Sequence, residues 1–257
     1  MRVRWVWAFL DLPEPGFEES VEFWRAVTRT RVSTRRGDEG QFATLLPQQG
    51  DPWVKVQRVG GPGGIHVDLD VEGPLEQARD EAVAVGATVL REDLEDGVLG
   101  VVVCRSPGGF VFCLTRWRPE ERGEGQVRAG QDSLLDQVCL DIPPSRYAAE
   151  AAFWSALTGW AVQGVDSPEF ERLEWPGGMP VRFLLQRLDS DEGPVRGHVD
   201  LACLDREAEA ARHVELGAER VGPGDGWVVM RSPVGHAYCC TGRHPVTGGA
   251  PPGPVRG

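Results

Sequence analysis

The chain has almost no lysine, very little tyrosine and no long apolar run. Lys55 is the only lysine among 27 basic residues, and two tyrosines stand against nine tryptophans. Acidic residues number 39, which gives a formal net charge of −12. A surface this acidic repels phosphate backbones and anionic lipid surfaces. We therefore expect neither nucleic acid nor a membrane surface as a partner.

The absence of a long apolar run also excludes a membrane-spanning helix. The apolar stretch at the N-terminus ends at Asp11, which is too early for the apolar region of a secretory signal, and no small-residue cleavage site follows it. We interpret this stretch as a first β-strand and expect a cytoplasmic protein.

Six cysteines are present, and none of them forms a Cys-x-x-Cys pair. Most lie within apolar, strand-like runs, where a free cysteine behaves as a small hydrophobic residue. A disulfide framework is not expected in a chain of this size and class. The six are Cys104, Cys113, Cys139, Cys203, Cys239 and Cys240.

The sequence is an internal duplication. A Phe-Trp pair occurs at Trp24 and again at Trp154, and a His-Val-Asp motif occurs at residues 66–68 and 198–200. A Ser-Pro-x-Gly motif follows in each half, at residues 106–109 and 232–235. The order of the motifs is the same and the spacing drifts only between them, as insertions in loops produce.

The repeat divides the chain into four parts. Residues 1–117 form a first domain and residues 133–243 a second. Residues 118–132 are charged and rich in glycine, as linkers are. Residues 244–257 are rich in Gly and Pro, cannot bury a core, and are expected to be disordered.

Each half alternates strands with helices. In the second half we expect a strand at 134–142, a helix from Pro144 to near Gly159, and short strands at 161–165, 169–175 and 181–186. A strand at 198–203 and a helix capped by Asp205 and stopped by Gly217 come next, then strands around 221, at 226–231 and at 236–241. The pattern is two βαβββ modules per domain, an α+β fold with helices on one face of a mixed sheet.

These motifs resemble the glyoxalase/bleomycin-resistance/dioxygenase domains of the vicinal oxygen chelate superfamily, in particular the glyoxalase-like group common in actinobacteria. The resemblance covers nearly the whole chain except linker and tail. It implies two tandem vicinal-oxygen-chelate domains, each made of two βαβββ modules that form a curved, cup-like mixed sheet. It also implies a small-molecule ligand inside the cup.

Metal-dependent relatives, by the same resemblance, place His or Gln, Glu, His and Glu on four strands of each cup. The matching positions here lack both carboxylates, which hard or borderline divalent ions prefer. We therefore expect no metal cofactor; if one binds, Gln137, His198 and Cys239 of the second domain would hold it. The matching residues are Trp7, Gln57, His66 and Cys113 in the first domain, and Gln137, Gln186, His198 and Cys239 in the second.

His66 and His198 are the candidate catalytic residues, although a histidine that only lines the cup is the simpler interpretation. We place Asp68 and Asp200 on the strand face opposite their histidines, and so expect no carboxylate–histidine pair within the motif. Cys113 and Cys239 are interpreted as small residues facing the core.

Other side chains are candidates for the pocket wall. Trp7 would suit a flat ligand through stacking, and Trp24 and Trp154 are expected to seat the helices on the sheets. Further candidates for ligand binding are Arg58 and Arg187, for which a solvated charge at the rim is the plainer interpretation. His236, which follows the hairpin glycine, is either a pocket residue or a turn residue.

Three functions follow. The first is a protein that binds a small organic molecule, aromatic or antibiotic-like, without a metal, and either sequesters it or transfers a proton with His198 or His66. The second is a metal-dependent lyase, isomerase or dioxygenase with the second domain active. The third is an interaction module with filled cups. Pairing of the domains within the chain would give a monomer, and a homodimer is the alternative.

Overall fold

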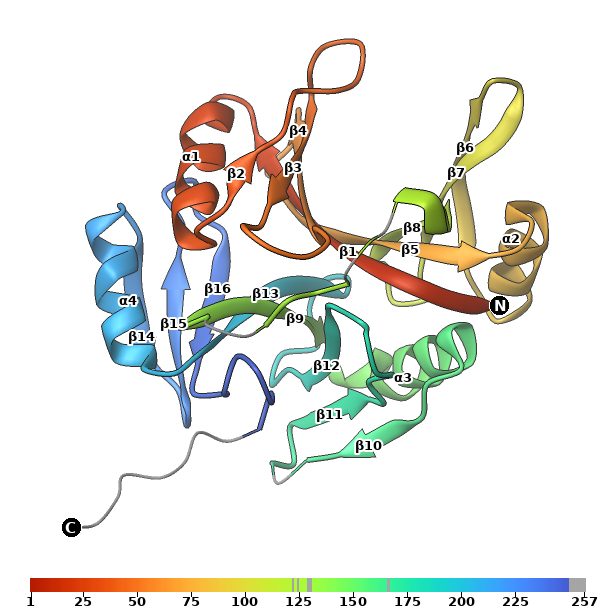
Figure 1. Cartoon of the computed structure of the whole chain (residues 1–257). Helices are drawn as coiled ribbons and strands as arrows, with labels where there is room; N and C mark the ends of the chain where they lie inside the picture. Colours follow the sequence, from red (N-terminus) through yellow and green to blue (C-terminus); the bar gives the residue numbers. More distant parts are fainter. Residues whose placement is uncertain (122, 124, 129–130, 166, 250–257) are drawn as a thin grey trace. The chain divides into compact units, whose positions relative to one another are not determined.

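The computed structural model describes residues 1–121, 123, 125–128, 131–165 and 167–249. Its strands form two eight-stranded sheets, in the orders β2-β3-β4-β1-β5-β8-β7-β6 and β10-β11-β12-β9-β13-β16-β15-β14 (Figure 1). Strands β5 and β8 pair in parallel, as do β13 and β16, and the flanking pairs are antiparallel. The sheets are therefore mixed, and each holds two βαβββ modules, which confirms the predicted fold class.

The first half of the chain contains eight strands and two α-helices among the described residues. A short 3-10 helix at Pro119–Glu121 follows the last of these strands. The eight strands and two α-helices are β1 (Arg2–Pro13), α1 (Phe17–Val27), β2 (Arg31–Val32), β3 (Phe42–Leu46), β4 (Val54–Val59), β5 (Gly64–Glu72), α2 (Leu75–Ala84), β6 (Thr88–Glu95), β7 (Val98–Arg105) and β8 (Val111–Arg116).

The second half repeats this order, and its boundaries agree with the predicted ones to within a few residues. Asp205 caps α4 as expected, because its side chain accepts hydrogen bonds from the amides of residues 207 and 208. The elements are β9 (Ser133–Ile142), α3 (Pro144–Thr158), β10 (Val162–Gly164), β11 (Phe170–Leu173), β12 (Arg182–Arg187), β13 (Arg196–Cys203), α4 (Arg206–Glu215), β14 (Glu219–Pro223), β15 (Trp227–Arg231) and β16 (Ala237–Thr241).

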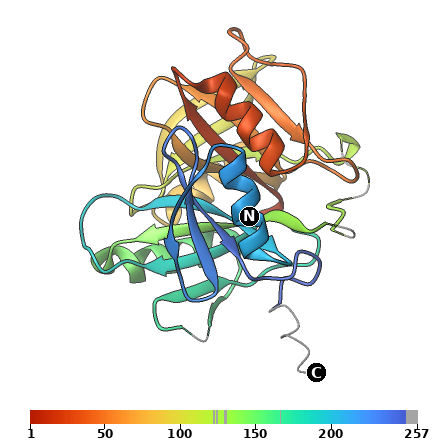
Figure 2. The same cartoon turned by 90° about the vertical axis from the view of Figure 1, so that its left-hand side faces the viewer.

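Two compact units can be separated, and each combines a module of one half with a module of the other. Unit 1 contains residues 1–9, 65–125 and 138–197, and unit 2 contains residues 10–64, 126–137 and 198–257. Helix α1 thus shares unit 2 with α4 (Figure 2), where the Arg212 side chain donates hydrogen bonds to the carbonyls of Ala26 and Val27 at 3.0 and 2.8 Å.

The helix tryptophans lie in the cores of the two units, as predicted. In unit 2, Trp24 of α1 packs edge-on against Tyr238 of β16, with ring centroids 5.2 Å apart. In unit 1, Trp154 of α3 packs at 5.3 Å against both Phe112 of β8 and Phe183 of β12. Both tryptophans are fully buried, so each fastens its helix to the sheet by area burial and ring contact.

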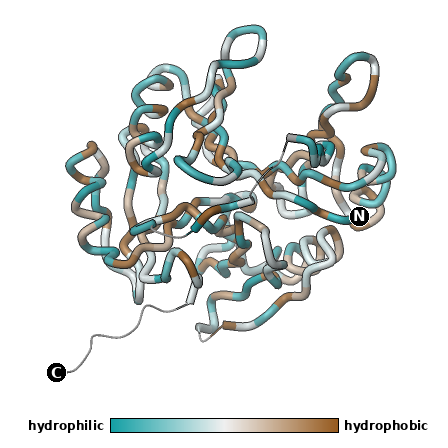
Figure 3. The backbone as a smooth tube through the Cα atoms, in the orientation of Figure 1, coloured by the Kyte–Doolittle hydropathy of each residue, from teal (hydrophilic) through white to brown (hydrophobic). Residues whose placement is uncertain are grey.

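Figure 3 shows how hydrophobic and hydrophilic residues are distributed along the chain. Strand β9 is buried at nine of its ten positions, although it contains Asp136 and Gln137. Both of these side chains are hydrogen-bonded, Asp136 to Arg243 and Gln137 to Asp200, as buried polar groups require. All six cysteines are free and buried. No helix in the described ranges has the length and apolarity required to cross a membrane. The end of the predicted disordered tail, residues 250–257, lies outside the described residues.

Candidate functional site

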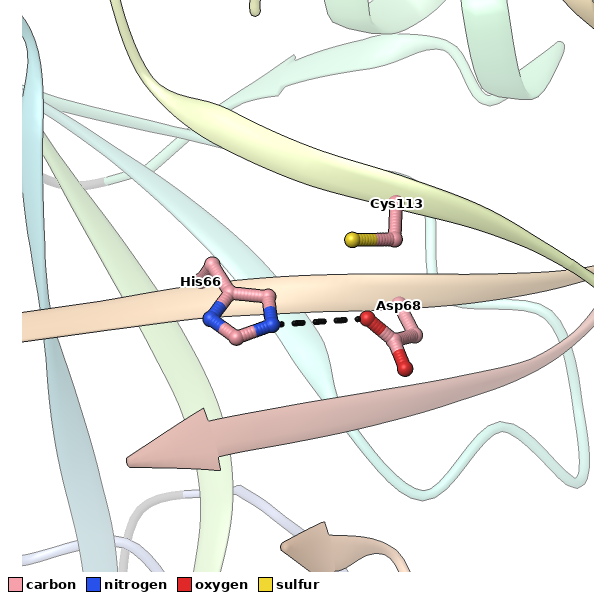
Figure 4. A group of neighbouring side chains, drawn as sticks. All are labelled: His66, Asp68 and Cys113. Atoms are coloured by element: carbon pink, nitrogen blue, oxygen red, sulfur yellow. Dashed lines mark ion pairs between the residues drawn. The ribbon is translucent and has the colours of Figure 1, made fainter. Parts of the chain in front are cut away.

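In unit 1, the parallel pair β5–β8 gathers a histidine, a carboxylate and a thiol. Its register places Asp68 directly opposite Cys113, and His66, two residues before Asp68 on the same strand, shares its face. The His66 Nε2 atom lies 3.5 Å from Asp68 Oδ1, and the Cys113 thiol points to both (Figure 4). All three side chains are buried.

The Ser-Pro-x-Gly motif sets the position of the cysteine. Ser106 Oγ accepts a hydrogen bond from the amide of Phe110 at 3.0 Å, which closes the turn that leads into β8. Gly109 has φ +109°, a conformation that only glycine adopts readily. The second half has the same turn, where Ser232 Oγ accepts from the amide of His236 at 3.1 Å. Each turn thus delivers a cysteine four residues after its glycine.

Unit 2 repeats the cluster. Asp200 lies opposite Cys239 in the parallel pair β13–β16, and His198 Nε2 is 3.4 Å from Asp200 Oδ1. The placement of Asp68 and Asp200 on the face opposite their histidines was therefore wrong. Residues two apart in a strand point to the same side because side chains alternate with a period of two.

The two carboxylates have different surroundings. Gln137 Nε2 donates to Asp200 Oδ2 at 2.6 Å, and the Arg243 guanidinium lies 3.9 Å from the same oxygen. Burial alone would raise the pKa of Asp200, but hydrogen bonding to His198 and the charge of Arg243 hold that pKa below its usual value.

In unit 1, a second buried carboxylate lies near the first. Asp70 accepts a hydrogen bond from the Trp7 indole at 3.1 Å and another from the Thr115 hydroxyl at 2.7 Å. Trp7 therefore uses its only polar atom to bind Asp70. Phe9 stacks on the His66 ring, with centroids 4.4 Å apart and planes inclined by 15°, so the imidazole is held in place by a flat aromatic neighbour.

The two thiols are protonated at neutral pH. Burial, with Asp68 close by, raises the pKa of Cys113 to about 11. Burial and Asp200 raise the pKa of Cys239 to about 11 in the same way. A thiol in this state can donate a hydrogen bond but is a poor nucleophile.

The remaining predicted pocket residues have other partners. Arg58 forms ion pairs with Glu14 and Glu39 at 3.1 and 3.6 Å. Arg187 is exposed and lies over the Tyr147 ring at 4.1 Å. Both arginines therefore have partners other than the clustered His, Asp and Cys residues.

Three further candidates are also placed by the structure. The Gln186 side-chain oxygen lies 3.8 Å from the Cys139 thiol, which donates to it. The half-buried His236 ring lies 3.2 Å from the Pro62 carbonyl. Gln57 lies half-buried opposite Phe42 in unit 2, whereas Trp7, His66 and Cys113 belong to unit 1.

The metal-binding positions implied by the family resemblance do not form an iron or manganese site here. Trp7 and Gln137 replace the first ligand, and Cys113 and Cys239 replace the last carboxylate. Hard ions need oxygen and imidazole ligands, which this set does not supply in sufficient number. The donor set that the structure does assemble is imidazole, carboxylate and thiol in each unit, a combination that suits zinc.

Replacing Asp200 by Asn should make the free energy of unfolding less dependent on pH in the acid range. A carboxyl group whose folded pKa is depressed stabilises the fold above its unfolded pKa of about 3.9, and this contribution is lost as the pH falls through the folded pKa. Urea unfolding between pH 6 and pH 3 would measure this, with exposed Asp225→Asn as control. Equal acid sensitivity of Asp200→Asn and the native chain would contradict it.

Comparison with known proteins agrees with this architecture. The family model described as a glyoxalase-like domain matches residues 7–115 and again 137–241. No curated protein sequence matches the chain. Among solved structures, the Mn(II)-bound glyoxalase from Novosphingobium aromaticivorans has a TM-score of 0.62 and 17% identity, over 99% of this chain and 88% of that one.

Two other solved structures share the fold. An extradiol ring-cleaving dioxygenase from B. fuscum has a TM-score of 0.62 and 14% identity, over 95% of this chain and 72% of that one. A xylose isomerase-like TIM barrel/4-hydroxyphenylpyruvate dioxygenase fusion protein has a TM-score of 0.61 and 15% identity over 99% of this chain, which spans 50% of that protein. The family model matches the chain twice, and the two matches together cover most of the chain. The chain therefore belongs to the glyoxalase-like domain family.

Proposed function

We propose that the protein binds a small organic molecule at its His–Asp–Cys clusters and exchanges a proton with it, without a resident divalent metal. The observation that carries this proposal is the pairing of an imidazole with a buried carboxylate in both units, 3.5 Å apart at the buried His66 and 3.4 Å apart at the half-buried His198. Each domain, residues 1–117 and 133–243, would then hold one site.

The chemistry of each cluster supports proton transfer. A neutral imidazole can take a proton from a bound ligand, and the neighbouring carboxylate stabilises the imidazolium that forms. The protonated thiol of Cys113 or Cys239 can donate a hydrogen bond to an oxygen of the ligand. No covalent step on sulfur is required, in keeping with the pKa of about 11 for both thiols.

In unit 2, the charge around the carboxylate argues against a resident cation. The half-buried Arg243 guanidinium lies close to Asp200 and also binds Asp136. A divalent ion at Asp200 would be repelled by this guanidinium at short range.

All six cysteines are free, which supports the further proposal that the protein works in the reducing cytoplasm.

A second candidate function is a metal-dependent lyase, isomerase or dioxygenase. Separations of 3.4 and 3.5 Å are long for a hydrogen bond between an imidazole and a carboxylate. They match the distance of about 3.4 Å between two ligand atoms that each lie about 2.0–2.1 Å from a tetrahedral zinc ion. A bound zinc ion would polarise a substrate oxygen or activate water; His66, Asp68 and Cys113, or their counterparts in unit 2, would hold it.

Metal analysis of protein purified without chelator separates the two candidates. We expect less than one tenth of an equivalent of zinc, iron or manganese per chain. One or two equivalents, lost in His66→Ala or His198→Ala but kept in His244→Ala, would establish the metal-dependent alternative.

A thermal-shift screen of small aromatic and carbonyl compounds tests the binding itself. A compound that binds the folded state raises the midpoint of unfolding, and we expect His66→Ala or His198→Ala to abolish that rise while His244→Ala keeps it. A screen without any such compound would favour the interaction module with filled cups.

A further inference from the structure

Unit 2 contains a cavity of about 150 Å³ that is separate from the His198 cluster. Its walls include Arg29 and Thr30 after α1, Trp53 and Val54 at the start of β4, and Leu201 of β13. Leu201 follows Asp200 directly, so its side chain points to the other face of the sheet. The lining also includes polar residues, Asp132 and Gln131 among them. A cavity of this volume can hold a molecule of the size of benzene.

The internal duplication shows that the fold does not require this cavity. With the offsets of the aligned motifs, Thr30 corresponds to Trp160 and Val54 to Phe183. Trp160 and Phe183 are both buried in unit 1, and their ring centroids lie 6.0 Å apart. Two packed aromatic rings therefore occupy the positions at which unit 2 has a threonine and a valine lining an open space.

Arg29 has an unusual backbone for a residue with a side chain. Its φ is +53°, in the left-handed region, whereas the corresponding residue of the second half is Gly159 with φ +74°. A non-glycine residue in this region carries a conformational cost, and such residues cluster at binding sites. In unit 2, the residue with this unfavourable backbone conformation is an arginine that lines the cavity.

Two polar side chains without a counterpart in unit 1 hold the Arg29 guanidinium in place. Arg29 donates to Ser133 Oγ at 2.6 Å and to both carboxylate oxygens of Glu209 at 2.8 and 2.9 Å. The residues corresponding to Ser133 and Glu209 are Val3 and Ala78, both buried and apolar. The supporting pair is thus specific to unit 2.

The guanidinium keeps capacity for a ligand. It has five N–H groups, and its three hydrogen bonds leave two without a partner in the part of the chain that the structure describes. The Arg29 side chain is 36% exposed, and two adjacent N–H groups match the oxygens of a carboxylate. Trp53, Val54 and Leu201 supply an apolar surface for the rest of the ligand.

We propose that this cavity is a second small-molecule site, which binds a small aromatic or branched aliphatic carboxylic acid of about the size of benzoate. The carboxylate lies against Arg29, and the apolar part lies between Trp53, Val54 and Leu201. The site is independent of the proposed function of the His–Asp–Cys clusters, since it uses none of their residues.

A fluorine NMR titration of the full chain with 4-fluorobenzoate tests the site. For a ligand this small, we expect a Kd on the order of 1 mM or tighter. Val54→Phe, which introduces the residue that the other half already has, should raise Kd at least about tenfold, while exposed Val221→Phe leaves it unchanged. No binding at 10 mM, or equal affinity of Val54→Phe and the native chain, would overturn the proposal.

The charge of the ligand is tested with 4-fluorobenzamide, which has the same shape without the carboxylate. The native chain should bind it at least about tenfold more weakly than the acid. In Arg29→Gly, which restores the residue of the other half, the two compounds should bind with similar affinity. A preference for the acid that survives in Arg29→Gly would contradict the role of Arg29.

Discussion

Replacing Glu209 by Ala should lower the free energy of unfolding by about 3–5 kcal/mol, the cost of removing one partner from a buried ion pair. Glu209 is a buried residue of α4. Its carboxylate accepts hydrogen bonds from Arg29, from Arg212 at 2.6 and 3.1 Å and from Ser133 at 2.5 Å, and it lies 3.2 Å from the His213 ring. Without it, two guanidinium groups and an imidazole would lose the carboxylate that all three contact.

Unfolding curves of the variant and the native chain in guanidinium chloride would measure this loss. Glu215→Ala is the matched control because Glu215 is exposed on the same helix, and such surface changes stay within about 0.5 kcal/mol. A loss below 1 kcal/mol in Glu209→Ala would show that the network contributes little to stability.

The pH dependence of stability gives a second measure of the same network. Burial alone would raise the pKa of Glu209, but His213, Arg212 and Arg29 hold it well below its usual value. Its contribution is therefore complete above the unfolded pKa of about 4.3 and is lost as the pH falls below it. Glu209→Gln should remove this part of the acid sensitivity.

The fold could be predicted from the sequence because its signals are local and occur twice. Asp205 and Gly217 mark the ends of α4 by capping chemistry, which depends only on neighbouring residues. The Phe-Trp pairs in α1 and α3 identified the buried helix faces, since a large aromatic ring on an amphipathic helix nearly always faces the core. Because the same motifs recur in the same order in both halves, each motif in one half supported the interpretation of its counterpart in the other.

The site was predicted only in part. His66, Cys113, His198 and Cys239 were selected and do come together within their units. Asp68 and Asp200, which complete the clusters, were placed on the wrong face of their strands, although a period of two puts each on the same face as its histidine.

Other features of the two units cannot be obtained from sequence patterns. The parallel register that sets Asp68 opposite Cys113 and Asp200 opposite Cys239 is a tertiary feature. The cavity beside Arg29 arises from small residues at positions that look like ordinary core and loop. Only the comparison of the two halves in three dimensions reveals what the substitutions do.

That comparison also predicts unequal effects of two matching core substitutions. Trp24→Ala and Trp154→Ala each remove a fully buried indole and should cost about 3–5 kcal/mol through lost contacts and the cavity left behind. Trp154 Nε1 also donates to the buried Glu150 at 2.9 Å, whereas Trp24 Nε1 makes no hydrogen bond among the described residues. Trp154→Ala should therefore be the more damaging, by about 1–3 kcal/mol, the cost of depriving a buried acceptor of its donor.

The phenylalanine variants separate the polar part of this difference from the packing part. Trp154→Phe and Trp24→Phe remove similar volumes, but only the first takes a donor from Glu150, which would then keep its 2.8 Å hydrogen bond from the Gly108 amide. Chemical unfolding should show a larger loss for Trp154→Phe than for Trp24→Phe. Equal losses would mean that Glu150 finds another donor when the indole is removed, and that the two tryptophans act by packing alone.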